Sequence, residues 1–168
     1  MMELFLSAFI TFFVVIDPPG CAPIYASLTK GANAAQRRNM AFRAVIVASG
    51  ILLVFALFGE QLLSALHIEL NSFRIAGGIM LFLIAIDMVF EKRTERREER
   101  AQKILDTPEI EDVSVFPMAM PMIAGPGSIA SVMLLMSQNS GVDRASVILG
   151  ALATVLVLTL LALLAAGP

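Results

Sequence analysis

Five apolar stretches, separated by polar segments, dominate the pattern of the chain. A transmembrane helix needs roughly 20 predominantly apolar residues, and the separating segments hold most of the charged side chains. The pattern therefore predicts an all-α, polytopic transmembrane helical bundle. The expected spans are Leu4–Leu28, Ala44–Phe58, Phe73–Phe90, Val113–Ser137 and Val147–Ala166.

The first stretch is interrupted at its centre by Asp17-Pro18-Pro19-Gly20, and Pro23 follows one turn later. A proline removes a helical hydrogen bond, whereas Asp followed by proline is favoured at a helix start. We therefore expect one half-helix that ends at Ile16 and a second that begins at Pro18. Non-helical backbone at this depth is tolerated only where protein buries it or water reaches it. The interruption therefore indicates either a binding site or a packed interior.

The fourth stretch has a similar interruption at Gly125-Pro126-Gly127-Ser128. Aligning Pro19-Gly20 with Pro126-Gly127 places Ile16 on Ile123, Asp17 on Ala124 and Cys21 on Ser128. Spans one and four cross in opposite directions, so the pattern is typical of two inverted-topology repeats of three spans each. We expect repeat one over about residues 1–90 and an incomplete repeat two over about 113–168. A sixth span is absent from the sequence, which favours a chain truncated before that span.

Two half-helices should begin near the membrane midplane, and their N-termini attract an anionic group. Asp17 supplies the opposite charge. This combination suits a zwitterion such as an amino acid, or a substrate together with a coupling proton or cation. Alternatively, Asp17 only caps a half-helix, Pro126 and Gly127 serve close contacts, and Ser128 bonds back to its own helix. The candidate substrate-binding residues are Asp17, Pro18, Pro19, Gly20, Pro23, Gly125, Pro126, Gly127 and Ser128.

Composition and charge agree with a membrane protein and suggest its orientation. Of the 168 residues 58% are hydrophobic and 15% are charged, against roughly 25% charged in soluble domains. The linkers after spans one and three hold ten of the twelve Lys and Arg residues. Because basic residues favour the cytoplasm, we expect the N-terminus outside and the linker at residues 91–112 inside. Within that linker, residues 91–103 lack helix breakers and should extend the third span as a solvated helix.

Several classes of function find no support in the residues. No nucleotide-binding loop, Ser/His pair, metal-ligating cluster or paired carboxylates occurs in the spans, so we expect neither an enzyme nor a cofactor or metal site. We also expect no nucleic-acid partner. The expected partners are the lipid bilayer and a small-molecule substrate, and a homo-oligomer is compatible with the sequence. A secondary transporter, a passive channel and a non-transporting scaffold or partner subunit remain open.

The chain resembles the MarC family of bacterial integral membrane proteins, within the LysE transporter superfamily. The resemblance implies a six-span protein of the bacterial inner membrane, and a neutral amino acid transporter-like function. It covers most of residues 5 to 136, and the present sequence departs from it mainly by ending before a sixth span. The matching pieces are Phe12–Gly20, Leu28–Gly31, Phe73–Ile79, Leu81–Met88, Val115–Pro121 and Gly125–Ser128.

Overall fold

A computed structural model of the chain describes residues 1–90, 98–99, 112–139 and 141–166. Over these residues it contains four helices long and apolar enough to cross a membrane, or five if a bent pair is one span. This confirms the all-helical, polytopic membrane fold. The helices are α1 (Met2–Ile16), α2 (Pro18–Leu28), α3 (Ala34–Ala65), α4 (Leu70–Val89), η1 (Ser114–Ile123), α6 (Pro126–Gln138) and α7 (Val142–Ala165).

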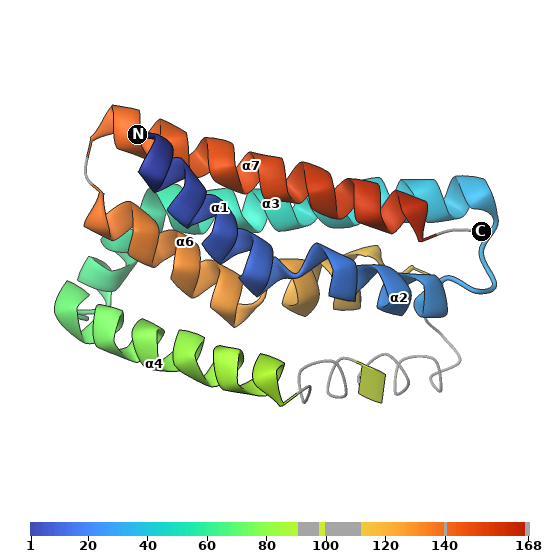
Figure 1. Cartoon of the computed structure of the whole chain (residues 1–168), viewed down its shortest axis with the longest axis horizontal. Helices are drawn as coiled ribbons and strands as arrows, with labels where there is room; N and C mark the ends of the chain where they lie inside the picture. The colour runs from blue at the N-terminus through green and yellow to red at the C-terminus, as the bar shows by residue number, and fades with distance from the viewer. Residues whose placement is uncertain (91–97, 100–111, 140, 167–168) are drawn as a thin grey trace.

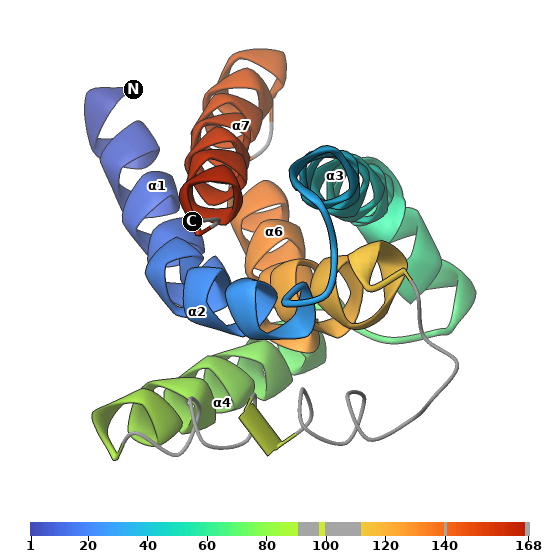
Figure 2. The same ribbon diagram turned by 90° about the vertical axis from the view of Figure 1, so that its right-hand side faces the viewer.

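The two broken spans, α1–α2 and η1–α6, pack against each other, and each packs mainly against one of the two long helices (Figures 1 and 2). Helix α7 contacts α1 and α2, while α3 contacts η1 and α6. In the end-on view of Figure 2, α6 lies near the centre of the bundle and α4 lies at its edge. Only Gly77 of α4 is buried, so most of this helix faces away from the bundle.

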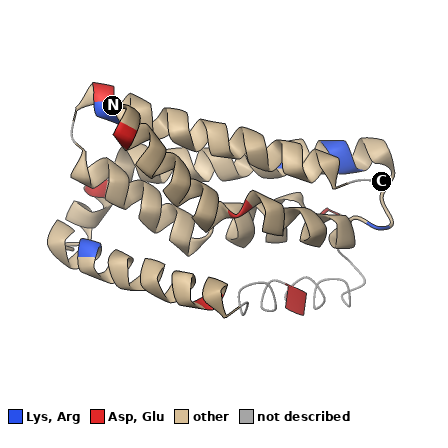
Figure 3. Cartoon of the chain, in the orientation of Figure 1, with Lys and Arg blue, Asp and Glu red and all other residues tan. Residues whose placement is uncertain are grey.

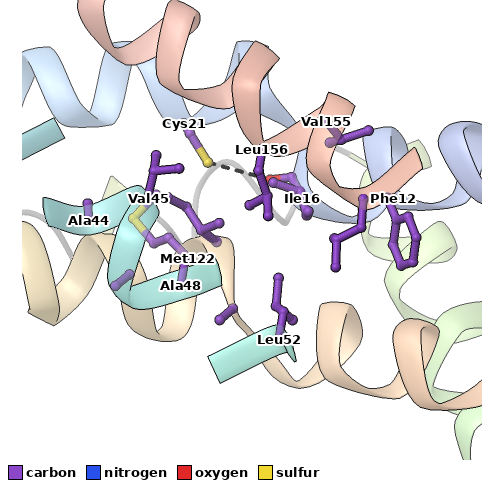
Figure 4. Packing of buried hydrophobic residues seen from close by; sticks show 14 of the residues in the cluster. Phe12, Ile16, Cys21, Ala44, Val45, Ala48, Leu52, Met122, Val155 and Leu156 are labelled. Carbon is purple, nitrogen blue, oxygen red and sulfur yellow. Dashed lines mark hydrogen bonds between the residues drawn. The ribbon is translucent and has the colours of Figure 1, made fainter. Parts of the chain in front are cut away.

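Small residues permit close contacts between helices in the interior. An added Cβ at Gly59 of α3 would lie 2.8 Å from the Met133 side chain. One at Gly77 of α4 would lie 2.9 Å from that of Leu134. Such small-residue contacts are the usual means by which membrane helices approach one another. The buried residues form one cluster that includes both sides of the first break, as Ile16 and Cys21 show in Figure 4.

The predicted boundaries hold best at the first break and least well at the second span. Helix α1 ends at Ile16 and α2 begins at Pro18, as expected. Helix α3 begins ten residues before Ala44, because Asn33 and Gln36 form a reciprocal capping box at its start. It also continues past Phe58 to Ala65, so the helix is longer than the apolar stretch at both ends. The predicted helical extension at residues 91–103 falls largely outside the described residues.

Basic residues gather at the end of the molecule where α2 leads into α3 and where α7 ends (Figure 3). They include Lys30 in the α2–α3 turn, and Arg37, Arg38 and Arg43 in the first three turns of α3. Arg43 forms an ion pair with Asp112 at 2.5 Å, but both side chains are exposed, so the pair adds little stability. Arg74 lies on α4, the helix whose N-terminus is at the opposite end (Figure 1).

Candidate functional site

The first break consists of Asp17, whose backbone is in the left-handed conformation and whose side chain caps the helix that follows. Asp17 has φ 59° and ψ 67°, and its Oδ1 accepts a hydrogen bond of 3.0 Å from the Gly20 backbone N–H. Asp is among the few non-glycine residues that tolerate this conformation, and its carboxylate is a favoured N-cap. A Cβ at position 20 would lie 2.1 Å from Oδ2 of Asp17, so the cap requires glycine there.

The second break uses glycine and proline without a carboxylate. Gly125 precedes α6, Pro126 occupies its first turn, and the two half-helices meet at 51°. A Cβ at Gly125 would lie 2.4 Å from the Pro121 carbonyl oxygen, so the turn requires a bare Cα. The half-helix before the break, η1, is itself irregular. Phe116 and Met120 are extended inside it, because each precedes a proline and is thereby kept from the α conformation.

The two breaks share a hydrogen bond at aligned positions. The Cys21 Sγ donates to the Ile16 carbonyl at 3.5 Å, and the Ser128 Oγ donates to the Ile123 carbonyl at 2.7 Å. Each bond spans five residues and links the second half-helix back to the last residue of the first. Ser128 therefore bonds across the break and not within its own helix. The two breaks therefore share this local construction.

The breaks are also close in space. A Cβ at Gly127 would lie 3.1 Å from Cγ1 of Val15 and 2.6 Å from Cδ1 of Ile84. Val15 is two residues before Asp17, so the start of α6 lies against the end of α1. Ala124, the residue aligned with Asp17, is buried at 1% exposure. The centre of the bundle thus holds one carboxylate-bearing break beside one that is neutral.

The candidate residues divide by exposure. Asp17 and Gly20 are partly buried at the first break, whereas Pro19, Pro23 and Pro126 are exposed. The remaining candidates are buried: Pro18, Gly125, Gly127 and Ser128. No group of three or more His, Cys, Asp or Glu that could hold a metal ion occurs in the described part of the chain.

The basic end contains a polar network that the sequence analysis does not predict. The Tyr25 hydroxyl donates to the Arg37 carbonyl, and the Thr29 Oγ1 donates to the Tyr25 carbonyl at 2.8 Å. The Arg37 Nε donates to the carbonyls of Thr29 (3.0 Å) and Ala32 (3.1 Å). These bonds hold the α2–α3 turn in place. A lone tyrosine in an apolar span was the only signal that the sequence offered.

Comparison with known proteins assigns the chain to a family. The family described as "MarC family integral membrane protein" matches residues 2–168. The chain is 38% identical to the UPF0056 membrane protein MJ1677 of Methanocaldococcus jannaschii, over 98% of this chain and 80% of that protein. It is 35% identical to the UPF0056 membrane protein YvbG of Bacillus subtilis, over 96% and 76% respectively. No solved structure matches it. The chain therefore belongs to the MarC family of integral membrane proteins.

Proposed function

We propose that this protein is a secondary transporter of small solutes, with neutral amino acids as the substrate class. The observation that carries the proposal is the contact between two broken helices inside the bundle, with Val15 against Gly127. Interrupted helices that meet in the interior are the usual binding elements of secondary transporters. A carboxylate beside a helix N-terminus, as at Asp17, offers a place for a substrate ammonium group, a proton or a cation.

The contacts between helices support two inverted repeats. If the chain contains two repeats, α1–α2 is equivalent to η1–α6, and α3 is equivalent to α7. The contact between α1 and α7 then corresponds to the contact between η1 and α3, and the contact between α2 and α7 corresponds to that between α6 and α3. Both members of each pair are present. The α3–α7 contact corresponds to itself, and the hydrogen bonds of Cys21 and Ser128 correspond in the same way. Rocking of one repeat against the other would then expose the breaks alternately to the two membrane faces.

A scaffold role is the second candidate, and a specific observation favours it. Cys21 and Ser128 both donate to carbonyls across their own breaks, and Asp17 accepts from its own helix. A break built only for close contact would satisfy its polar groups in this way. A transporter must release or share at least one of these groups when a substrate binds.

Flux through proteoliposomes separates these functions. Uptake and efflux of radiolabelled neutral amino acids would be measured with and without an imposed pH gradient. We expect saturable flux that responds to the gradient. A passive channel would give non-saturable flux driven only by the solute's own gradient. A scaffold would give no flux above that of protein-free vesicles.

The orientation of the chain is a further prediction. Because basic residues favour the cytoplasm, we expect residues 91–112 inside and the α6–α7 connection outside. Reporter fusions after Arg97 and Asn139 would test this expectation. Cytoplasmic reporter activity at Arg97 and periplasmic activity at Asn139 are expected, and the reverse pattern would invert the proposed orientation.

A further inference from the structure

A cavity of about 650 Å³ lies between the C-terminal part of α3, the start of α4, the end of α6 and the start of α7. We call it the outer cavity, because it lies away from the basic end formed by the α2–α3 turn and the start of α3. Its size is typical of small-molecule sites. Its apolar walls include Phe55, Met133 and Met136, and its polar lining residues are Glu60, Gln61, Ser137 and Asn139.

Two polar side chains of the outer cavity donate hydrogen bonds to the backbone of α6. The Ser137 Oγ donates to the Leu134 carbonyl at 2.9 Å, and the Asn139 Nδ2 donates to the Leu135 carbonyl at 3.0 Å. The serine hydroxyl keeps its lone pairs as acceptors, and the asparagine amide keeps its oxygen and one N–H. Gln61 adds an amide group that can both accept and donate. Glu60 adds a carboxylate, which only accepts when it is ionised.

The charge of the lining has one sign. Glu60 is the one charged side chain among the described lining residues, and no Lys, Arg or His belongs to that set. Arg74 on α4 binds the Ser137 carbonyl at 2.9 Å but does not line the cavity. A lining whose only charged side chain is a carboxylate suits a ligand that brings positive charge and hydrogen-bond donors. A divalent metal ion fits less well, since it requires several charged oxygen ligands.

The opposite wall offers the complementary group. Helix α7 begins at the cavity with Gly141, Val142 and Ala145 among the lining residues. No side chain caps its N-terminus, and Asp143, the acidic residue of its first turn, is not among the lining residues. Its first backbone N–H groups have no partner within the helix and favour an anion. The Glu60 carboxylate on α3 and the Asn139 amide at the end of α6 thus share the cavity with an uncapped helix start on α7. An ammonium group and a carboxylate on the same small molecule would match both walls.

We propose that the outer cavity is an entry site for a zwitterionic amino acid with an apolar side chain. Glu60 and Asn139 hold the ammonium group, the start of α7 holds the carboxylate, and the methionines contact the side chain. This inference rests on the proposed transport function, because an entry site presupposes that the substrate moves from the outer face to the breaks. It adds a site that is separate from the breaks themselves.

Equilibrium binding to the purified full chain in lipid nanodiscs tests this site without requiring transport. The probes are L-leucine, 3-methylbutylamine, which lacks the carboxylate, and 4-methylpentanoate, which lacks the ammonium group. We expect L-leucine to bind best. We expect Glu60→Gln to weaken L-leucine and 3-methylbutylamine by at least about tenfold, as loss of a charge-assisted hydrogen bond predicts. Binding of 4-methylpentanoate should not weaken, because the lost charge repels its carboxylate.

Glu69→Gln is the matched control, because Glu69 is an exposed carboxylate just before α4 that does not line the cavity. It should leave binding of L-leucine unchanged. Equal affinity of wild type and Glu60→Gln for L-leucine, or no saturable binding to wild type, would overturn the proposed site. Glu60-dependent binding without flux in proteoliposomes would instead retain the site and reject the transport function. Flux together with binding that does not depend on Glu60 would retain the transport function and reject the site.

Discussion

Replacing Gly125 by alanine is expected to destabilise the protein by roughly 3 kcal/mol, at the upper end of the range for overpacked interiors. The added Cβ would lie 2.4 Å from the Pro121 carbonyl oxygen. That atom belongs to the backbone of η1, so it cannot move aside by a change of rotamer. The bend between η1 and α6 would have to open, which would also disturb the contact of α6 with α1. The measurement is the thermal unfolding midpoint of the purified protein in detergent.

Gly150→Ala is the matched control for this change. Gly150 lies within α7, and a Cβ there would meet no atom within 4 Å. Alanine in a helix interior is favoured over glycine by about 0.5–1 kcal/mol, so this variant should be as stable as wild type or slightly more stable. An unchanged midpoint for Gly125→Ala would show that the second break relaxes freely, contrary to the close contact that the structure describes.

Replacing Asp17 by asparagine is expected to leave the fold intact and to abolish transport or uncouple it from the proton gradient. Asparagine keeps the oxygen that accepts from Gly20, and it tolerates the left-handed conformation that Asp17 adopts. Only the negative charge is lost. Expression and the unfolding midpoint should therefore match wild type, while flux in proteoliposomes is lost or no longer responds to pH.

Asp17→Ala separates the two roles of this side chain. Alanine lacks the capping oxygen and is strained in the left-handed region, so together these effects should cost about 2 kcal/mol or more. We therefore expect a lowered midpoint for alanine and a normal one for asparagine. Wild-type flux and pH dependence in Asp17→Asn would reduce Asp17 to a structural cap. Failure of Asp17→Asn to fold would show that the charge serves the fold.

The sequence predicted the elements whose causes are local. Asp17 followed by Pro18 both ends one helix and begins the next, so the first break could be located to the residue. Helix α3 begins ten residues before the apolar stretch, because the capping pair Asn33 and Gln36 starts the helix in a polar segment that hydropathy does not mark. The apolar pattern indicates which part of the helix spans the membrane, whereas the capping residues determine where the helix begins.

Features that depend on distant segments could not be predicted from the sequence in the same way. The approach of Gly127 to Val15 and Ile84 joins three helices, and repeat symmetry suggested only that the breaks would meet. The bond from Tyr25 to Arg37 depends on the path of the α2–α3 turn. The outer cavity draws on residues from α3 to α7, and Glu60 had no distinguishing motif around it.

Thiol labelling of Cys21 tests alternating access at the breaks most directly. Cys21 is the only cysteine in the sequence, and its side chain is fully buried beside the first break. A small membrane-impermeant thiol reagent would be added to the outside or to the inside of oriented proteoliposomes. We expect labelling from each side, at rates that a transmembrane pH gradient and saturating L-leucine shift in opposite directions, and none in Cys21→Ser. Flux without labelling from either side, or labelling from both sides at rates that neither condition changes, would contradict a transport path through the two breaks.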